Sequence, residues 1–336
     1  MTNSVLPRRV VCFGEMLLRL TPPGRDLLLQ TPRLETSFGG AETNVAVGLA
    51  QLGDDSRIVS VLPDNAIRQA ALAELRRWGV NAGGVRTAPG RMGLYFLTPG
   101  AVLRPAEVLY DRTGSAFAGA APDLIDWTAE LEGAAWLHLS GITPAVSLNA
   151  AAAALTAVKA ARALGVQVSF DGNFRVRVWA DRIGDAPAIL HKIVAHADLA
   201  FIDHRDIGLI LGEAFDDPGA AANAAFKAFP SLTRIASTSR AIRGPEDHDL
   251  TGRLLTRDGG HQTETVRLKN IVDRVGAGDA FSAGVLHGLI AGQGEAEALD
   301  YGLACCALKH GIVGDFPLIT QDDVARFSAE HSDLRR

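Results

Sequence analysis

Short apolar strands alternate with helical segments through most of this 336-residue chain. Helical spacing of apolar residues and C-terminal glycines predicts helices at 41–52, 65–79, 207–212 and 221–229, and an alanine-rich helix that ends at Gly165. The intervening strands are predicted at 8–14, 56–62, 134–141, 166–173, 198–203 and 232–238. Because these strands look buried on both faces, we expect an α/β fold: a mostly parallel sheet in a three-layer α/β/α domain.

Two segments interrupt this alternation. Residues 17–37 hold two strand-like pieces, "LLRLTP" and "DLLLQ", and residues 91–112 read as a hairpin that turns at Pro99-Gly100. They are either surface hairpins or a small β-lid that closes over a site at the carboxyl ends of the parallel strands. We predict the lid, formed by 17–37 and 91–112, on a main domain of residues 1–16, 38–90 and 113–336.

Composition narrows the class of protein. The net charge is −5 and no basic stripe is present, which disfavours nucleic acid as a partner. The three cysteines have neither zinc-ligand nor disulfide-framework spacing. Because no signal peptide and no run of ~20 apolar residues is found, we expect a cytoplasmic enzyme without a membrane partner.

A glycine-framed acid in "DRVGAGDAFSAG", residues 273–284, is the strongest chemical signal. A dinucleotide-binding fingerprint is disfavoured because Phe281 replaces its third small residue, and a P-loop because no lysine follows the glycines. Gly276, Ala277 and Gly278 instead would expose backbone N–H groups at the start of a helix predicted at 280–290, which is an anion site. Asp279, beside this site, could serve as the base in a phosphoryl transfer. The alternative is that Asp279 only caps the N-terminal end of the helix.

A second glycine pair opens the helix predicted at 41–52. In "FGGAETN", Gly39 and Gly40 leave backbone N–H groups free to meet a ligand hydroxyl, and Asn44 lies one turn further on. The alternative is a tight strand-to-helix turn in which Asn44 caps locally.

These stretches resemble the ribokinase-like (PfkB) family of carbohydrate kinases over nearly the whole chain. "GGAETNVAVGLAQLG", "LHLSGITPA", "SFDGNFRVRVW" and "DRVGAGDAFSAG" carry the resemblance, and the two middle blocks are most similar to the branch that phosphorylates keto-deoxy sugar acids. The resemblance implies an ATP- and Mg²⁺-dependent kinase for the 6-hydroxyl of 2-keto-3-deoxygluconate. It also implies that Asp279 is the base and that Gly276 to Gly278 form the anion hole.

The resemblance further implies a sugar site. Its residues match Gly39, Gly40, Asn44, Tyr95, Tyr110, Arg112, Asn173 and Arg175. A sugar acid carries a carboxylate, which a planar guanidinium binds through two parallel hydrogen bonds, so the arginines favour an acid over a neutral sugar. Surface arginines and tyrosines that only pack in the lid are the alternatives. A fructose-like sugar, the galactonate epimer and a non-catalytic sensor also stay open, although a sensor would tolerate loss of Asp279.

The chain departs from the family pattern in two places. Where many relatives have Asn-x-x-Glu, this chain has Asp203 and Asp206, and we expect Asp206 to serve the metal. The nucleotide-covering glycine loop is replaced by residues 237–254. The predicted nucleotide contacts are Ser237, Thr238, Arg240, Gly276 and Gly278, while His310 either contacts nucleotide or packs. A homodimer or higher homo-oligomer through the lid strands is also expected.

Overall fold

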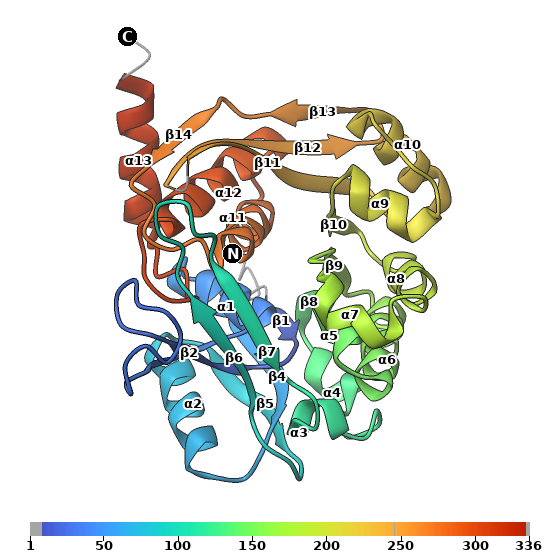
Figure 1. Cartoon of the computed structure of the whole chain (residues 1–336). Coiled ribbons are helices and arrows are strands. Elements are labelled where there is room, and N and C mark those ends of the chain that lie inside the picture. Colours follow the sequence, from blue (N-terminus) through green and yellow to red (C-terminus); the bar gives the residue numbers. More distant parts are fainter. Residues whose placement is uncertain (1–8, 245, 334–336) are drawn as a thin grey trace, which may run out of the picture.

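The computed structural model describes residues 9–244 and 246–333 and contains two β-sheets (Figure 1). The large sheet has ten strands in the order β13-β12-β11-β10-β9-β8-β1-β4-β5, with β14 beside β12. Its strands are β1 Arg9–Phe13, β4 Ser56–Leu62, β5 Asn81–Thr87, β8 Ala134–Ser140, β9 Gln167–Asp171, β10 Leu199–Phe201, β11 Arg234–Gly244, β12 Asp247–Thr256, β13 Gly259–Gln262 and β14 Val266–Lys269. The strands pair in parallel from β5 to β11, and β12, β13 and β14 add an antiparallel edge.

Helices cover both faces of this sheet. Along β1, Val10 and Cys12 belong to the core beneath the first group of helices, whereas Val11 and Phe13 belong to the opposite core, as the two-residue period of a strand requires. The first group contains α1 Ala41–Gln51, α2 Ala66–Arg77, α11 Ala277–Ile290 and α12 Glu295–Lys309. The second contains α3 Ala116–Gly119, α4 Trp127–Leu131, α5 Ile142–Val146, α6 Leu148–Ala163, α7 Val176–Trp179, α8 Ala186–Val194, α9 His204–Leu211 and α10 Pro218–Ala228. The predicted three-layer α/β/α fold is confirmed.

Two further helical elements complete the chain. The short 3₁₀ helix η1, Ala180–Arg182, follows α7, and α13, Gln321–Asp333, follows α12. Among the residues that the structure describes, no helix is both long and apolar enough to cross a bilayer.

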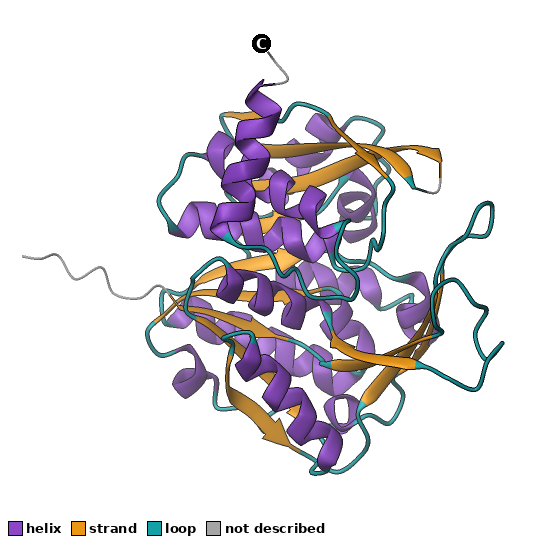
Figure 2. Ribbon diagram, turned by 90° about the vertical axis from the view of Figure 1, so that its left-hand side faces the viewer, coloured by secondary structure: helices purple, strands orange, loops and turns teal. Residues whose placement is uncertain are grey.

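The small sheet has four strands in the order β3-β2-β6-β7 and lies at one side of the molecule (Figure 2). Its strands are β2 Leu17–Thr21, β3 Glu35–Gly39, β6 Gly93–Thr98 and β7 Glu107–Asp111. The predicted hairpin at 91–112 is confirmed, because β6 and β7 pair antiparallel. The predicted strand "DLLLQ" is wrong: Leu27 and Leu29 are 50% and 70% exposed in a turn region, and β2 pairs with β3 instead. The exact lid boundaries stay a prediction.

Three further features of the structure differ from the sequence prediction or were absent from it. The segment that replaces the glycine loop of relatives belongs to two paired strands, β11 and β12, with Arg240 opposite Leu250, and alternate β12 side chains are buried against the core. Strand β5 has no counterpart in the sequence prediction, and neither have the edge strands β13 and β14. Helix α11 begins at Ala277 instead of Ala280, so Asp279 lies within its first turn.

Candidate active site

A cleft of about 2270 Å³ opens between the small sheet and the carboxyl ends of the parallel strands. Most of the residues predicted for the site line it, namely Gly40, Asn44, Tyr95, Tyr110, Arg112, Asn173, Arg175, Asp206, Arg240, Gly276, Gly278 and Asp279. Gly39, Ser237, Thr238, Ala277 and His310 are not among the lining residues. The fold therefore brings the predicted base and the predicted sugar contacts to one space.

Asp279 lies in the first turn of α11 and is 9% exposed. The helix is capped by Gly276 at φ 79°, and no side chain bonds to this end. Asp279 is therefore not the cap of its helix, and the capping interpretation is wrong. The first N–H groups of a helix have no acceptor within it. Ala277 N donates to Arg274 O at 3.3 Å, but Gly276 and Gly278 line the cleft, so this end still presents donors to it.

The opposite wall supplies a partner for the acid. Asn44, from α1, donates through Nδ2 to Oδ2 of Asp279 at 2.6 Å, so Asn44 does not cap its own helix. Burial raises the pKa of Asp279 to about 7; Asn44 and Arg175 oppose this rise, whereas Asp315 and Glu42 add to it. A carboxylate with a pKa near 7 can accept a proton at neutral pH, which suits a general base.

The start of α1 is anchored by Glu42, which the sequence analysis did not single out. Its Oε1 accepts hydrogen bonds from Ser140 N at 2.9 Å, Ser140 Oγ at 2.7 Å and Thr143 Oγ1 at 2.7 Å. Gly40 precedes the helix at φ 139°, and a Cβ there would run into the carbonyl oxygen of Glu15. These contacts fix α1 against the end of β8 and so hold Asn44 beside the acid.

The two predicted arginines differ in their surroundings. Arg112 is buried and its Nε donates to Oε2 of Glu15 at 2.6 Å, so one side of the guanidinium is already paired. It is therefore not a surface arginine. Arg175 is exposed on the loop after β9, and its charge lowers the pKa of Asp279 and of Asp171 against the effect of burial. An anionic ligand could contact both guanidinium groups from within the cleft.

The hydroxyl group of Tyr95 is already hydrogen-bonded within the protein. Its hydroxyl donates to Asp315, with oxygen–oxygen distances of 2.6 and 2.7 Å, and burial followed by the charge of Asp315 raises the pKa of Tyr95. Tyr110 lies 6.2 Å away between ring centroids and also lines the cleft. Asn173 adopts φ 35° on the same loop as Arg175.

The expected metal residue, Asp206, is also part of a capping box. Its Oδ2 accepts from Asp203 N at 3.1 Å, and Asp203 Oδ1 accepts from Asp206 N at 3.1 Å. Burial raises the pKa of Asp206 to about 6, and burial, Asp279 and Asp206 raise the pKa of Asp171. Carboxylates that repel one another suit a cation. Across residues 9–244 and 246–333, however, no group of three or more metal-binding side chains is found. A divalent cation at these carboxylates would therefore keep several water ligands.

Three cationic side chains that line the cleft, Arg175, Arg240 and Arg274, lie close enough to affect one another. Burial lowers the pKa of Arg240, and the charges of Arg274 and Arg175 lower it further. Cations that destabilise one another favour an anionic ligand between them. His310 is buried, with Nδ1 2.7 Å from the carbonyl oxygen of Cys306, so packing explains it better than nucleotide contact does.

The cleft also contains charged residues that sequence reasoning missed. Among them are Glu15, Arg19, Asp273 and Asp315, which pair with other side chains within the protein. Asp273 stands at the head of the glycine motif, which was the one available signal. Glu15, Arg19 and Asp315 carried no such signal, because each pairs with a residue 97 or more positions away in the sequence.

Comparison with known proteins agrees with this geometry. Residues 7–314 match the model of the pfkB family carbohydrate kinases. The 2-dehydro-3-deoxygalactonokinase of Haloferax volcanii is 33% identical, covering 94% of this chain and 95% of that protein. Probable fructokinase-6 of Arabidopsis thaliana is 32% identical, covering 92% of this chain and 79% of that protein. The crystal structure of 2-dehydro-3-deoxygluconokinase from Thermotoga maritima has a TM-score of 0.91 and 32% identity, covering 96% of this chain and 99% of that one. The chain belongs to the PfkB family of carbohydrate kinases.

Proposed function

We propose that this sugar kinase transfers the γ-phosphoryl group of ATP to the 6-hydroxyl of a 2-keto-3-deoxy sugar acid, with 2-keto-3-deoxygluconate as the first candidate. The observation that carries the proposal is the buried carboxylate of Asp279. It lies at the N-terminal end of α11, bonded to Asn44 and open to the cleft.

In the proposed reaction the sugar hydroxyl lies against Asp279. Its oxygen attacks the γ-phosphorus while its proton passes to the carboxylate, and the bond to the β,γ-bridging oxygen breaks to release ADP. The N–H groups at Gly276 to Gly278 would stabilise the charge on the moving phosphoryl group. Asp206, with Asp171 beside it, would hold Mg²⁺ through water, and the ion would neutralise phosphate charge.

The choice of a sugar acid rests on the arginines. Arg175 is exposed, and Arg112 lines the same cleft with its Nε bonded to Glu15, so both guanidinium groups could bind a carboxylate under the small sheet. Closure of that sheet as a lid would exclude water from the phosphoryl group. The names of the relatives from Haloferax volcanii and Thermotoga maritima support the class but differ in the epimer.

A neutral sugar such as fructose is the second candidate. The similarity to probable fructokinase-6 favours it, since the kinase chemistry at Asp279 does not depend on the carboxylate. On this alternative, the cleft arginines would serve only the nucleotide and the internal pairing with Glu15.

A coupled ADP-release assay tests the proposal. The assay combines Mg-ATP with 2-keto-3-deoxygluconate, its galactonate epimer, fructose and ribose as separate acceptors. Turnover on a keto-deoxy acid at a kcat/KM at least ~100-fold above that on fructose is expected, because a site built for a charged group rejects an analogue that lacks it. Turnover on fructose alone would remove the sugar-acid assignment and keep the kinase.

A further inference from the structure

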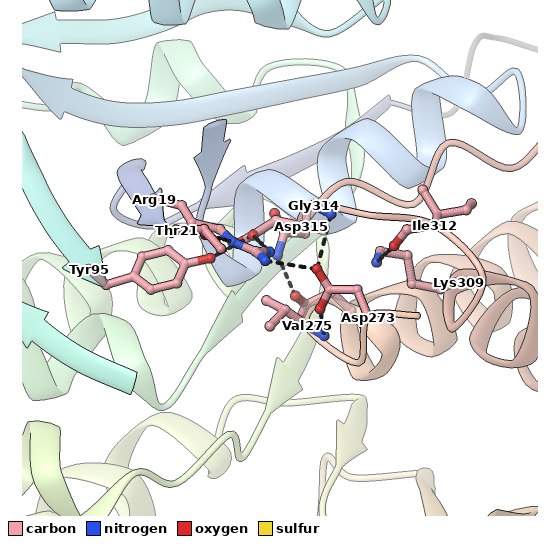
Figure 3. Close-up of polar contacts among 11 residues, drawn as sticks. Arg19, Thr21, Tyr95, Asp273, Val275, Lys309, Ile312, Gly314 and Asp315 are labelled. Atoms are coloured by element: carbon pink, nitrogen blue, oxygen red, sulfur yellow. Dashed lines mark hydrogen bonds and ion pairs between the residues drawn. The ribbon is translucent and has the colours of Figure 1, made fainter. Parts of the chain in front are cut away.

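A buried ion-pair network joins the small sheet to the loops around the start of α11 (Figure 3). Arg19, on β2, donates through Nη1 to Asp315 Oδ1 at 2.9 Å and through Nη2 to Asp273 Oδ2 at 2.8 Å. Its Nε donates to Thr21 Oγ1 at 2.9 Å, and the side chain is only 4% exposed. Each of the three guanidinium nitrogens thus donates to a fixed acceptor.

Both acidic residues lie against the backbone that leads into α11, Asp273 through its carboxylate and Asp315 through its main chain. Asp273 accepts from Val275 N at 3.0 Å and from Gly314 N at 3.1 Å, and so ties the loop before α11 to the loop between α12 and α13. The carbonyl oxygen of Asp315 lies so close to Gly276 that a Cβ there would run into it. Arg19 therefore binds the two loops that flank the N–H groups of the anion hole.

The charges of the network nearly balance. Burial lowers the pKa of Lys309, whereas Asp273 and Asp315 oppose this change; its Nζ donates to Ile312 O at 2.9 Å. Arg19 and Lys309 thus face two carboxylates. A buried ion pair adds little to the stability of a fold, because the cost of desolvating the two charges offsets most of their attraction. Stability therefore does not explain why this network lies beside the N-terminal end of α11.

We infer that Arg19 is a positioning residue of the phosphoryl transfer. Arg19 bridges Asp315 and Asp273 and so fixes the two loops on either side of Gly276. With the small sheet in this position, the N–H groups at the start of α11 are held toward the phosphoryl group. The inference rests on the proposed function. It adds that a side chain of the small sheet, which need not touch either substrate, orients the anion hole.

The kinetic test uses Arg19→Gln and Arg19→Lys, with Arg57→Gln as the matched control. Arg57 also pairs with a buried carboxylate, Glu130, at 2.7 Å, but on β4 and outside the cleft. For Arg19→Gln we expect kcat to fall ~100-fold while the KM for ATP changes less than ~3-fold, since small misplacements of reacting groups have effects of this size. Arg19→Lys, which can reach one carboxylate but cannot bridge both, should recover only part of kcat. Arg57→Gln should lower Tm without changing kcat.

A second readout reports on the anion hole without a sugar. Mg-ADP with aluminium fluoride, a mimic of the transferred phosphoryl group, should raise the Tm of the wild-type protein above the value with Mg-ADP alone. Arg19→Gln should lose this extra increment and keep the increment due to Mg-ADP. If Arg19→Gln has the kcat of the wild type and keeps the aluminium fluoride increment in Tm, the inference is overturned. The proposed function is not affected by that result.

The remaining outcomes are also decisive. Should the wild type neither phosphorylate any sugar of the panel nor respond to aluminium fluoride, the proposed function fails and the inference with it. If Arg19→Gln does not fold, Asp273→Asn replaces it, since the amide keeps an acceptor for the backbone but loses the charge that faces Arg19. A kcat for Asp273→Asn within twofold of wild type would then contradict the inference.

Discussion

Asn44 and Asp279 are 235 residues apart in the sequence, yet the amide of the first donates to the carboxylate of the second at 2.6 Å. The bond joins the starts of α1 and α11, two helices that open with glycine and point their N-terminal ends at one cleft. It gives the proposed base a fixed orientation and opposes the rise that burial causes in its pKa.

Replacing Asp279 by Asn should abolish most of the turnover. We expect kcat to fall by ~10³-fold, within the range attributed to general bases, while the KM for the sugar changes less than ~3-fold. Steady-state kinetics with Mg-ATP and the preferred sugar measure both. The amide keeps the size of the side chain, so a Tm no lower than that of the wild type serves as the control. Near-normal turnover would rule out Asp279 as the base.

The rate should depend on pH through the same group. Because the pKa of Asp279 is raised to about 7, its carboxylate form is lost as the pH falls through 7, and kcat/KM should drop on the acid side. Asn44→Ala removes a donor that lowers the pKa, so the acid limb should move up by about one pH unit. The shift distinguishes Asp279 from Asp206, whose pKa of about 6 lies nearby but which does not bond to Asn44. An unmoved limb would contradict the assignment.

Stability should show the opposite trend. A carboxyl whose folded-state pKa is raised binds its proton more tightly in the folded state than in the unfolded state, so it favours folding at pH below about 4 and disfavours it above about 7. Asp279→Asn removes this term. Denaturant unfolding at pH 8 should therefore give a higher unfolding free energy for the variant than for wild type, with a smaller difference at pH 5.

The two arginines should differ in what their loss does. Arg175→Ala should raise the KM for a sugar acid ~10-fold or more, since charged hydrogen bonds are worth about 1.5–3 kcal/mol, and leave Tm unchanged. Arg112→Ala should raise KM and also destabilise the fold by about 3 kcal/mol, because it leaves the buried Glu15 unpaired. The control is Arg177→Ala: Arg177, on the adjoining helix α7, also lines the cleft, but its guanidinium donates to Val108 O at 3.1 Å. Equal KM values for all three variants would argue for a neutral sugar.

Metal dependence should be altered at Asp206. Asp206→Asn keeps an acceptor for the N–H of Asp203, so α9 should remain capped. Loss of the charge should raise the Mg²⁺ concentration for half-maximal rate about 10-fold, and excess Mg²⁺ should restore kcat. Titration of MgCl₂ at a fixed total ATP concentration measures this, and an unchanged requirement would place the metal elsewhere.

Sequence patterns predicted the main architecture because they report on local physics. The two-residue and 3.6-residue periods of burial, together with glycines at helix ends, located β1, β4, β8, β9, β10 and α1, and hence the parallel three-layer fold. The same periods gave a wrong strand at "DLLLQ", where Leu27 and Leu29 are exposed. They also missed β12, whose side chains are alternately buried but whose charged residues near the turn obscure that pattern. Local sequence cannot show whether an apolar run has a surface to pack against.

The sequence by itself determined which backbone can bind an anion and which acid stands beside it, because glycine conformations and helix ends are encoded within a few residues. Only the tertiary structure decided that Asn44 orients Asp279, that Tyr95 and Arg19 converge on Asp315, and that Glu15 holds one edge of Arg112. Each of these contacts joins distant segments that are brought together by the order of the strands and by the position of the small sheet. Burial then sets the charge and the pKa of the groups involved, and burial is a property of the assembled fold rather than of any stretch of the chain.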